Sequence, residues 1–187
     1  MPVYQGPILG FDAAGYSQQP NLGQAAVQEL IQDELDRAIG KLRSRIGHQI
    51  WVNAGDGGYL AMQGDVELGP NVLELFSEHI RKRNAQMRQD ALVKMRYALH
   101  FGTIIKEQGR MGPAVSGDGI NVLERMLTLM PRDRPGQVVI SDHYRNILVE
   151  DAGMNPSRFQ AMADLIDKHG KVHVVWNFFG SSFGVRI

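Results

Sequence analysis

Two aspartates, Asp12 and Asp56, each lie at the end of an apolar run and beside glycine. Asp12 follows the letters I-L-G-F and precedes A-A-G, and Asp56 lies within W-V-N-A-G-D-G-G-Y. Such runs, ended by turn residues, predict two buried strands that each stop at a carboxylate. A carboxylate at a strand end can hold a hard cation while neighbouring backbone N–H groups receive phosphate. The pattern therefore indicates a metal and phosphate site, provided that the two strand ends meet.

Each aspartate also has a purely structural interpretation. Asp12 could cap a turn or a helix, and Asp56 could be an ordinary turn residue, because Asp-Gly is a common turn pair. The structural interpretation is weaker for Asp12, since the A-A-G that follows it does not look like the start of a helix.

Composition bounds the class of protein. The chain has 187 residues, 43% apolar and 21% charged, which predicts one globular domain over residues 1–187. A net charge of zero weighs against a nucleic-acid binder. Cysteine is absent, which excludes disulfides and thiolate metal sites. No long apolar run or signal peptide is evident, so we expect a cytoplasmic protein with no direct membrane contact.

Hydrophobic periodicity predicts an α+β domain with the order β-α-β-β-α-β and further elements after it. The expected strands cover residues 7–13, 49–54, 58–62, 95–103, 137–140 and 171–178. The expected helices cover residues 24–42, 72–91, 120–130 and 142–148. Residues 107–117 are rich in glycine and are expected to form a mobile loop, and the tail 180–187 could add a strand.

Two further groups of polar residues could serve a phosphoryl reaction. Asn121 and Arg125 are four residues apart on an expected helix and therefore point the same way. Asn could orient a ribose, and Arg could neutralise charge on a transferring phosphate; the alternative is a solvated helix face. Lys168 and Lys171 precede the last expected strand and could hold a terminal phosphate, or could be solvated loop charges.

Taken together, the order and spacing of these segments resemble the class III nucleotidyl cyclases, the family of adenylyl and guanylyl cyclase catalytic domains. F-D-A-A-G-Y at 11–16 looks like the first metal motif, and G-D at 55–56 matches the second. Y-A-L-H-F-G at 97–102 is similar to the G-I-H-x-G strand, with Ala98 in place of the first glycine. Residues 117–126 look like G-x-x-V-N-x-A-x-R-M, the most specific match. V-I-S at 139–141 and K-H-G-K at 168–171 complete the order.

The resemblance implies a ferredoxin-like class III cyclase domain, with a mostly antiparallel sheet covered by helices. It implies two divalent cations, Mn²⁺ or Mg²⁺, at a metal site. The metal site would comprise Asp12, Ala13 and Asp56. Catalysis would involve Asn121, Arg125 and Lys171, and the substrate-binding residues would include Ala14, Gly15, Tyr16 and Lys168. It also implies a homodimer with shared active sites, in which metals come from one subunit and Asn and Arg from the other.

The expected base pocket departs from the family pattern. In the family, one residue that reads the base lies three positions before the second G-D motif and is usually lysine or glutamate. Here that residue is Val52. The second reading position, seven residues before the catalytic Asn, is Ala114 instead of a polar residue. Neither side chain can hydrogen-bond a purine edge. Trp51, Asn53 and Tyr97 are candidate base contacts, with ordinary strand residues as the alternative.

Retained catalytic positions with an altered base pocket resemble the pyrimidine cyclases of bacterial antiphage defence, the Pycsar systems. This resemblance implies a uridylate cyclase that converts UTP into cyclic UMP and pyrophosphate, and a separate cyclic-nucleotide-sensing effector. A cytidylate cyclase that makes cyclic CMP, a conventional adenylyl or guanylyl cyclase, and a non-catalytic nucleotide-binding homologue remain alternatives.

Overall fold

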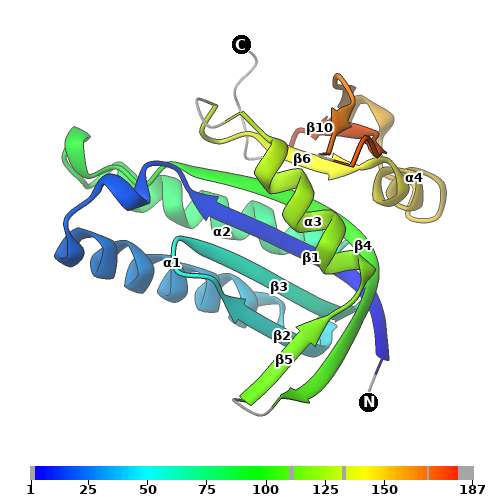
Figure 1. Ribbon diagram of the computed structural model, residues 1–187, viewed down its shortest axis with the longest axis horizontal. Coiled ribbons are helices and arrows are strands. Elements are labelled where there is room, and N and C mark those ends of the chain that lie inside the picture. The colour runs from blue at the N-terminus through cyan, green and yellow to red at the C-terminus, as the bar shows by residue number, and fades with distance from the viewer. Residues whose placement is uncertain (1–2, 110–111, 132–133, 168, 181–187) are drawn as a thin grey trace.

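The structure is a computed structural model that describes residues 3–109, 112–131, 134–167 and 169–180. An eight-stranded sheet forms its centre, in the order β2-β3-β1-β4-β6-β10-β7, with β5 paired to β4 outside this path (Figure 1). The strands are β1 (Val3–Ala13), β2 (Ile46–Asn53), β3 (Gly57–Gly64), β4 (Met95–Gly109), β5 (Gly112–Ser116), β6 (Val138–Ser141), β7 (Phe159–Ala161) and β10 (Val175–Phe178). The β4–β6 pair is parallel and the other pairs are antiparallel.

Helices cover both faces of this sheet. They are α1 (Asn21–Leu42), α2 (Leu68–Asn84), α3 (Asp118–Leu129) and α4 (Asp142–Glu150), with short 3₁₀ turns η1 (Tyr16–Gln18), η2 (Arg43–Arg45), η3 (Gln89–Ala91) and η4 (Pro156–Arg158). A small two-stranded sheet pairs β8 (Leu165–Ile166) with β9 (Val172–His173). The expected α+β fold, mostly antiparallel and covered by helices, is confirmed. None of the described helices is long and apolar enough to cross a membrane.

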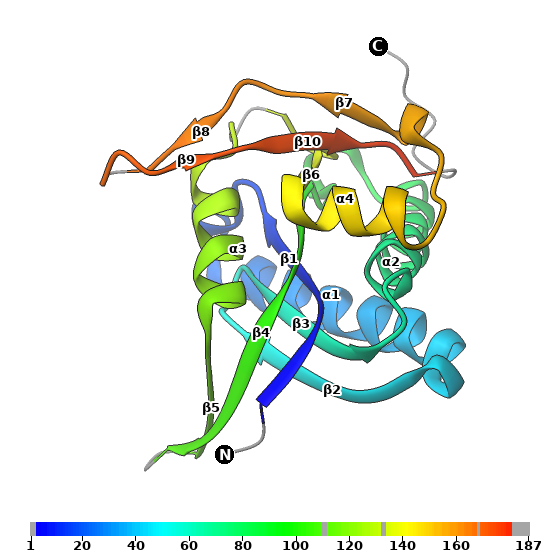
Figure 2. The same ribbon diagram turned by 90° about the vertical axis from the view of Figure 1, so that its right-hand side faces the viewer.

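Alternation along β1 separates two buried layers. Leu9 and Phe11 point into a large core with residues of α1, α2 and α4, whereas Ile8 points into a second core under α3. Figure 2 shows α3 on one side of β1 and β4 and α2 on the other. Each fully buried large apolar side chain contributes about 1.5–3 kcal/mol, so these two layers account for the placement of the helices.

The bounds of two expected helices differ by three residues or more from those observed. α1 begins at Asn21, three residues earlier than the periodicity predicts. α2 covers Leu68–Asn84 instead of residues 72–91, and Pro70 lies in its first turn, where a missing N–H costs no hydrogen bond. The helix ends at Asn84, whose side chain donates to the carbonyl of Val93 at 2.8 Å and accepts from its N–H at 2.9 Å.

The expectation of a loop over residues 107–117 was also wrong. The described residues 107–109 belong to β4 and residues 112–116 form β5, and the two strands pair antiparallel from Ile105 opposite Ser116 to Gly109 opposite Gly112. Glycines in this segment had indicated a loop, but backbone pairing does not need side chains. The single strand expected over 171–178 is divided between β9 and β10, and β7 and β8 were missed because they are two or three residues long. The tail 181–187 lies outside the described residues.

Glycines bring neighbouring elements unusually close where the candidate residues lie. A Cβ on Gly57 would lie 2.0 Å from the carbonyl oxygen of Phe11, so the turn that carries Asp56 packs against β1 only because residue 57 has no side chain. Similarly, a Cβ on Gly102 would lie 2.8 Å from the Cα of Gly119, which lets the start of α3 rest on β4. Both contacts position polar residues described below.

We expect Gly57→Ala to destabilise the fold by about 1–3 kcal/mol, because its Cβ meets rigid backbone of β1. Gly40→Ala is the matched control: a Cβ on Gly40, in α1, meets nothing within 4 Å. That change should leave the stability equal or raise it by up to about 1 kcal/mol. Urea unfolding of both variants measures the difference, and equal stabilities would contradict the close approach at Gly57.

Candidate active site

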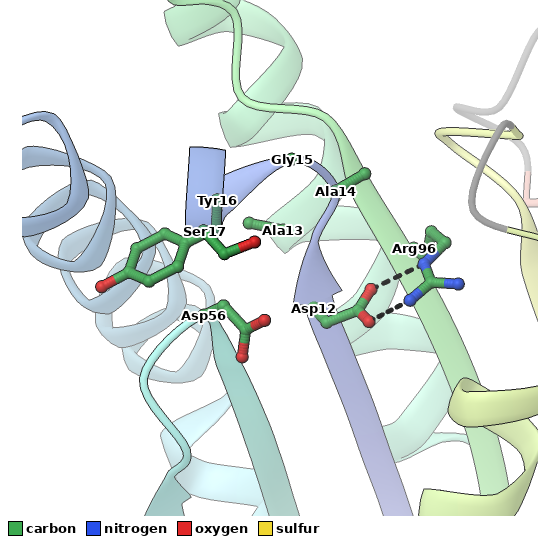
Figure 3. A pocket seen from close by; sticks show the side chains of 8 residues that line it. All are labelled: Asp12, Ala13, Ala14, Gly15, Tyr16, Ser17, Asp56 and Arg96. Carbon is green, nitrogen blue, oxygen red and sulfur yellow. Dashed lines mark hydrogen bonds and ion pairs between the residues drawn. The ribbon is translucent and has the colours of Figure 1, made fainter. Parts of the chain in front are cut away.

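Asp12 and Asp56 line one small pocket at the end of β1 (Figure 3). Asp12 is the penultimate residue of β1, and Asp56 lies in the turn between β2 and β3. Ala13 donates its N–H to the carbonyl of Asp56 at 2.7 Å, which joins the turn to the strand end. The Asp56 side chain is exposed, whereas that of Asp12 is 23% exposed. The full set of lining residues is Asp12, Ala13, Ala14, Gly15, Tyr16, Ser17, Asp56 and Arg96. We call this the acidic pocket.

The chain turns sharply at the rim of the acidic pocket. Ala14 donates its N–H to the carbonyl of Lys94 at 2.7 Å, and Gly15 then takes a left-handed conformation, with φ 77°. The 3₁₀ turn η1 follows, and Tyr16 packs against the larger core. The expected metal and substrate residues from Asp12 to Tyr16 are therefore brought together.

Arg96 is the one described cation in the lining, and no motif in the sequence marks it as a site residue. Register places Arg96 in β4 directly opposite Asp12 in β1. Its guanidinium donates to both carboxylate oxygens of Asp12, from Nε at 2.8 Å and from Nη2, and Nη1 donates to the carbonyl of Met130 at 2.8 Å. Its side chain is only 5% exposed. Figure 3 shows the Asp12 carboxylate turned toward it.

The donor set of the acidic pocket suits a hard divalent cation. It offers carboxylate oxygens from Asp12 and Asp56, which are ligands that Mg²⁺ and Mn²⁺ favour. Each oxygen of a carboxylate has two acceptor positions, so the contacts with Arg96 leave Asp12 able to bind a cation. In the described residues no group of three or more His, Cys, Asp or Glu gathers as a metal site, so these two carboxylates are the acidic ligands on offer.

The other expected catalytic residues form a second group on α3 and the β8–β9 hairpin. Asn121 and Arg125 lie on the outer side of α3, whose inner side buries Ile120, Leu123 and Met126. Arg125 forms an ion pair with Asp167, with 3.5 Å between Nη1 and Oδ2, and Lys171 donates its N–H to the same carboxylate at 3.0 Å. We call Asn121, Arg125, Asp167 and Lys171 the α3 cluster. Lys168 lies outside the described residues.

The acidic pocket and the α3 cluster are separate in one chain. Neither Asn121, Arg125 nor Lys171 is among the residues that line the acidic pocket. The pocket measures about 60 Å³, whereas sites that enclose small-molecule ligands occupy about 300–1,000 Å³. In the described part of the chain, the expected site residues therefore lie in two separate groups.

The residues expected to contact the base differ in their position and burial. Val52 lies in β2, half-buried and opposite Tyr59 of β3, and Ala114 lies in β5 opposite Glu107. Tyr97 is 3% exposed and meets Phe76 edge-on in the core, so it presents no surface to a base.

Two further candidates have local partners. Trp51 stacks on Phe11, with 5.3 Å between ring centroids, and Asn53 accepts from the N–H of Gly55 at 2.8 Å within its own turn. Burial therefore favours the ordinary structural interpretation for Tyr97, whereas Trp51 is half-buried and Asn53 exposed, so both stay candidate base contacts.

Comparison with known proteins identifies the fold. Neither a family model nor a curated protein sequence matches the chain. Among solved structures, an adenylate/guanylate cyclase/hydrolase from Silicibacter pomeroyi is similar at 21% identity and a TM-score of 0.71, over 97% of this chain and 99% of that one. The guanylate cyclase domain of RhGC from Catenaria anguillulae, in complex with GTP, is similar at 14% identity and a TM-score of 0.71, over 96% of this chain and 99% of that one.

A third similar structure is the guanylyl cyclase domain of the RhoGC fusion protein from the aquatic fungus Blastocladiella emersonii, in an unconventional dimeric form. It shares 14% identity and a TM-score of 0.69, over 96% of this chain and 99% of that one. The chain has the fold of the class III adenylyl and guanylyl cyclase domains, as the sequence resemblance implied.

We expect the Arg96–Asp12 pair to be strongly coupled, because the guanidinium is buried and binds both carboxylate oxygens. A double-mutant cycle with Arg96→Met and Asp12→Asn should give a coupling free energy of about 2 kcal/mol or more in chemical unfolding. The exposed pair Arg45–Asp65 is the matched control and should give about 1 kcal/mol or less. Equal couplings would show that Arg96 does not hold Asp12 as described.

Proposed function

We propose that the chain is a nucleotidyl cyclase that converts a pyrimidine nucleoside triphosphate, UTP in preference to CTP, into the 3′,5′-cyclic nucleotide and pyrophosphate. One observation carries the proposal: Asp12 and Asp56 converge on one pocket at adjacent strand ends, within a cyclase fold. Ala13 would add its carbonyl oxygen as a metal ligand, and Ala14, Gly15 and Tyr16 would line the path of the phosphates. The whole of residues 1–187 would form this catalytic domain.

The proposed roles follow from the chemistry of each side chain. Two bound divalent cations, Mn²⁺ or Mg²⁺, would supply activation of the ribose 3′-hydroxyl and charge neutralisation at the α-phosphate. Asn121 would orient the ribose, and Arg125 would bind the charge that develops on the phosphate. Lys171, or Lys168, would hold the terminal phosphate as a point charge. Arg96 would add fixed positive charge beside the phosphates.

A homodimer would unite the two partial sites. The acidic pocket is too small to enclose a nucleotide, and the α3 cluster does not line it. A head-to-tail arrangement of two copies would bring the α3 cluster of one subunit over the acidic pocket of the other and create two complete sites. The guanylyl cyclase domain from Blastocladiella emersonii, a non-canonical dimer, supports dimerisation for this fold, and the head-to-tail geometry is part of our proposal.

The preference for a pyrimidine comes from the proposed base pocket. Val52 and Ala114 have no polar side-chain atoms with which to read the edge of adenine or guanine. The Pycsar resemblance extends the proposal to antiphage defence, in which the cyclic nucleotide would activate a separate effector that senses it. A conventional purine cyclase is the alternative enzyme.

A non-catalytic nucleotide-binding module is the second candidate. The observation that favours it is the bidentate pair between Arg96 and Asp12, because a guanidinium there already balances the charge that a cation would balance. This candidate predicts nucleotide binding without turnover.

The direct test incubates the purified protein with ATP, GTP, CTP or UTP and Mn²⁺, followed by chromatography and mass spectrometry. We expect cyclic UMP, or cyclic CMP, and no turnover by Asp56→Ala, because that change removes a metal ligand. Asp65→Ala is the matched control, an exposed carboxylate in an ion pair away from the pocket, and should keep normal turnover. Cyclic AMP or cyclic GMP would overturn the pyrimidine assignment, and substantial product from Asp56→Ala would overturn the metal site.

Mixing two inactive variants tests the shared site. Asp56→Ala damages only the acidic pocket, and Arg125→Ala damages only the α3 cluster. In a head-to-tail dimer, a mixed dimer contains one site that carries both changes and one intact site. We therefore expect co-refolded mixtures to recover up to about one quarter of wild-type turnover, since about half of the dimers are mixed. No recovery from mixtures shown to contain mixed dimers would contradict the shared site.

A further inference from the structure

Asp167 is a buried carboxylate for which the sequence analysis found no role. It follows β8 directly, and its side chain is only 6% exposed. A buried carboxylate is stable only when its oxygens are bound by donors. Its partners therefore show what it holds in place.

One oxygen of Asp167 binds the backbone of the hairpin. Oδ1 accepts from the N–H of His169 at 2.9 Å and from the N–H of Lys171 at 3.0 Å. Gly170 completes the turn in a left-handed conformation, with φ 76°. The carboxylate therefore fixes the backbone from which Lys171 extends.

The other oxygen faces the side chains of a histidine and an arginine. Oδ2 lies 3.2 Å from Nε2 of His173 and 3.5 Å from Nη1 of Arg125. Burial raises the pKa of Asp167, but hydrogen bonds from His173, Lys171 and His169 and the charge of Arg125 outweigh it and lower the pKa to about 2. Asp167 is therefore ionised at neutral pH and can attract the guanidinium.

Arg125 has considerable freedom without this contact. It lies on the outer side of α3, and its side chain is 40% exposed. Holding a long side chain at an exposed position costs conformational entropy, so a flexible arginine is poorly prepared for a transition state. A buried, charged partner on a neighbouring element supplies the restraint.

We propose that Asp167 is a positioning residue for catalysis, which holds the guanidinium of Arg125 toward the substrate phosphates and couples it to the turn that carries Lys171. The inference deepens the proposed cyclase function and rests on it. Asp167 itself touches no reacting atom, and its effect passes through Arg125. The competing interpretation is that Asp167 only shapes the hairpin turn.

Asp167→Asn separates these two roles. The amide oxygen can still accept from the N–H groups of His169 and Lys171, so the turn is kept. The negative charge of residue 167, which attracts the guanidinium of Arg125, is lost. We expect kcat for the pyrimidine substrate to fall about 10- to 100-fold while KM changes less than about threefold, because orientation matters most in the transition state. Asp65→Asn is the matched control and should keep both constants.

A second change tests whether the effect passes through Arg125. In an Arg125→Gln background, followed with α-³²P-labelled substrate, Asp167→Asn should change kcat by less than about threefold, since residues that act as a unit are not additive. If Asp167→Asn does not fold, Asp167→Ser is measured in its place, because its hydroxyl can still accept from the turn.

The outcomes separate the inference from the function it rests on. No turnover by the wild type with any of the four triphosphates would count against the proposed function. Wild-type turnover with kcat unchanged in Asp167→Asn would overturn the positioning role alone. The same loss of kcat in the Arg125→Gln background as in the wild type would also overturn it, because Asp167 would then act independently of Arg125.

Discussion

The pairing of β1 between β3 and β4 is the constraint on which the candidate site depends. One register places Asp12 opposite Gly57 on one side and opposite Arg96 on the other. Gly57 lets the turn with Asp56 close against β1, and Arg96 holds the Asp12 carboxylate. A shift of one residue in this strand register would turn Asp12 to the other face of the sheet and remove it from the pocket. The chemistry therefore depends on backbone pairing as much as on the acidic residues themselves.

Charged residues gather in two separate groups, which we propose are complementary partial sites. The acidic pocket holds carboxylates with one buried arginine. In the α3 cluster the Arg125 side chain and the backbone N–H of Lys171 contact the buried Asp167, and Asn121 lies four residues before Arg125 on α3. In each group one buried charged residue pairs with a more exposed proposed site residue: Arg96 with Asp12, and Asp167 with Arg125. Such pairs contribute little net stability, because desolvation offsets their attraction, but they hold side chains in one orientation. Preorganisation of this kind is what transition-state stabilisation requires.

The sequence allowed the fold class, the main strands and the aspartate pair to be predicted, because hydrophobic periodicity and Asp-Gly turns are local signals. It did not identify Arg96 or Asp167. Arg96 lies opposite Asp12 through the register of β1 and β4, and Asp167 meets Arg125 through the packing of α3 against a hairpin of very short strands. Both are contacts between residues far apart in the sequence. Tyr97 was a candidate base contact but is buried in the core, because an aromatic residue beside a motif can equally serve packing. The roles of Asn121, Arg125, Lys171, Val52 and Ala114 stay predictions.

The central claim is that Asp12 and Asp56 bind divalent cations around a nucleotide that is ready to cyclise. The most direct measurement is electron paramagnetic resonance of Mn²⁺ with the protein and 3′-deoxy-UTP, which lacks the attacking hydroxyl and so cannot turn over. The account predicts two Mn²⁺ ions per site with the spin coupling of ions about 3.5–4 Å apart, and loss of that signal in Asp56→Asn. Uncoupled Mn²⁺, bound equally by the wild type and by Asp56→Asn, would contradict it.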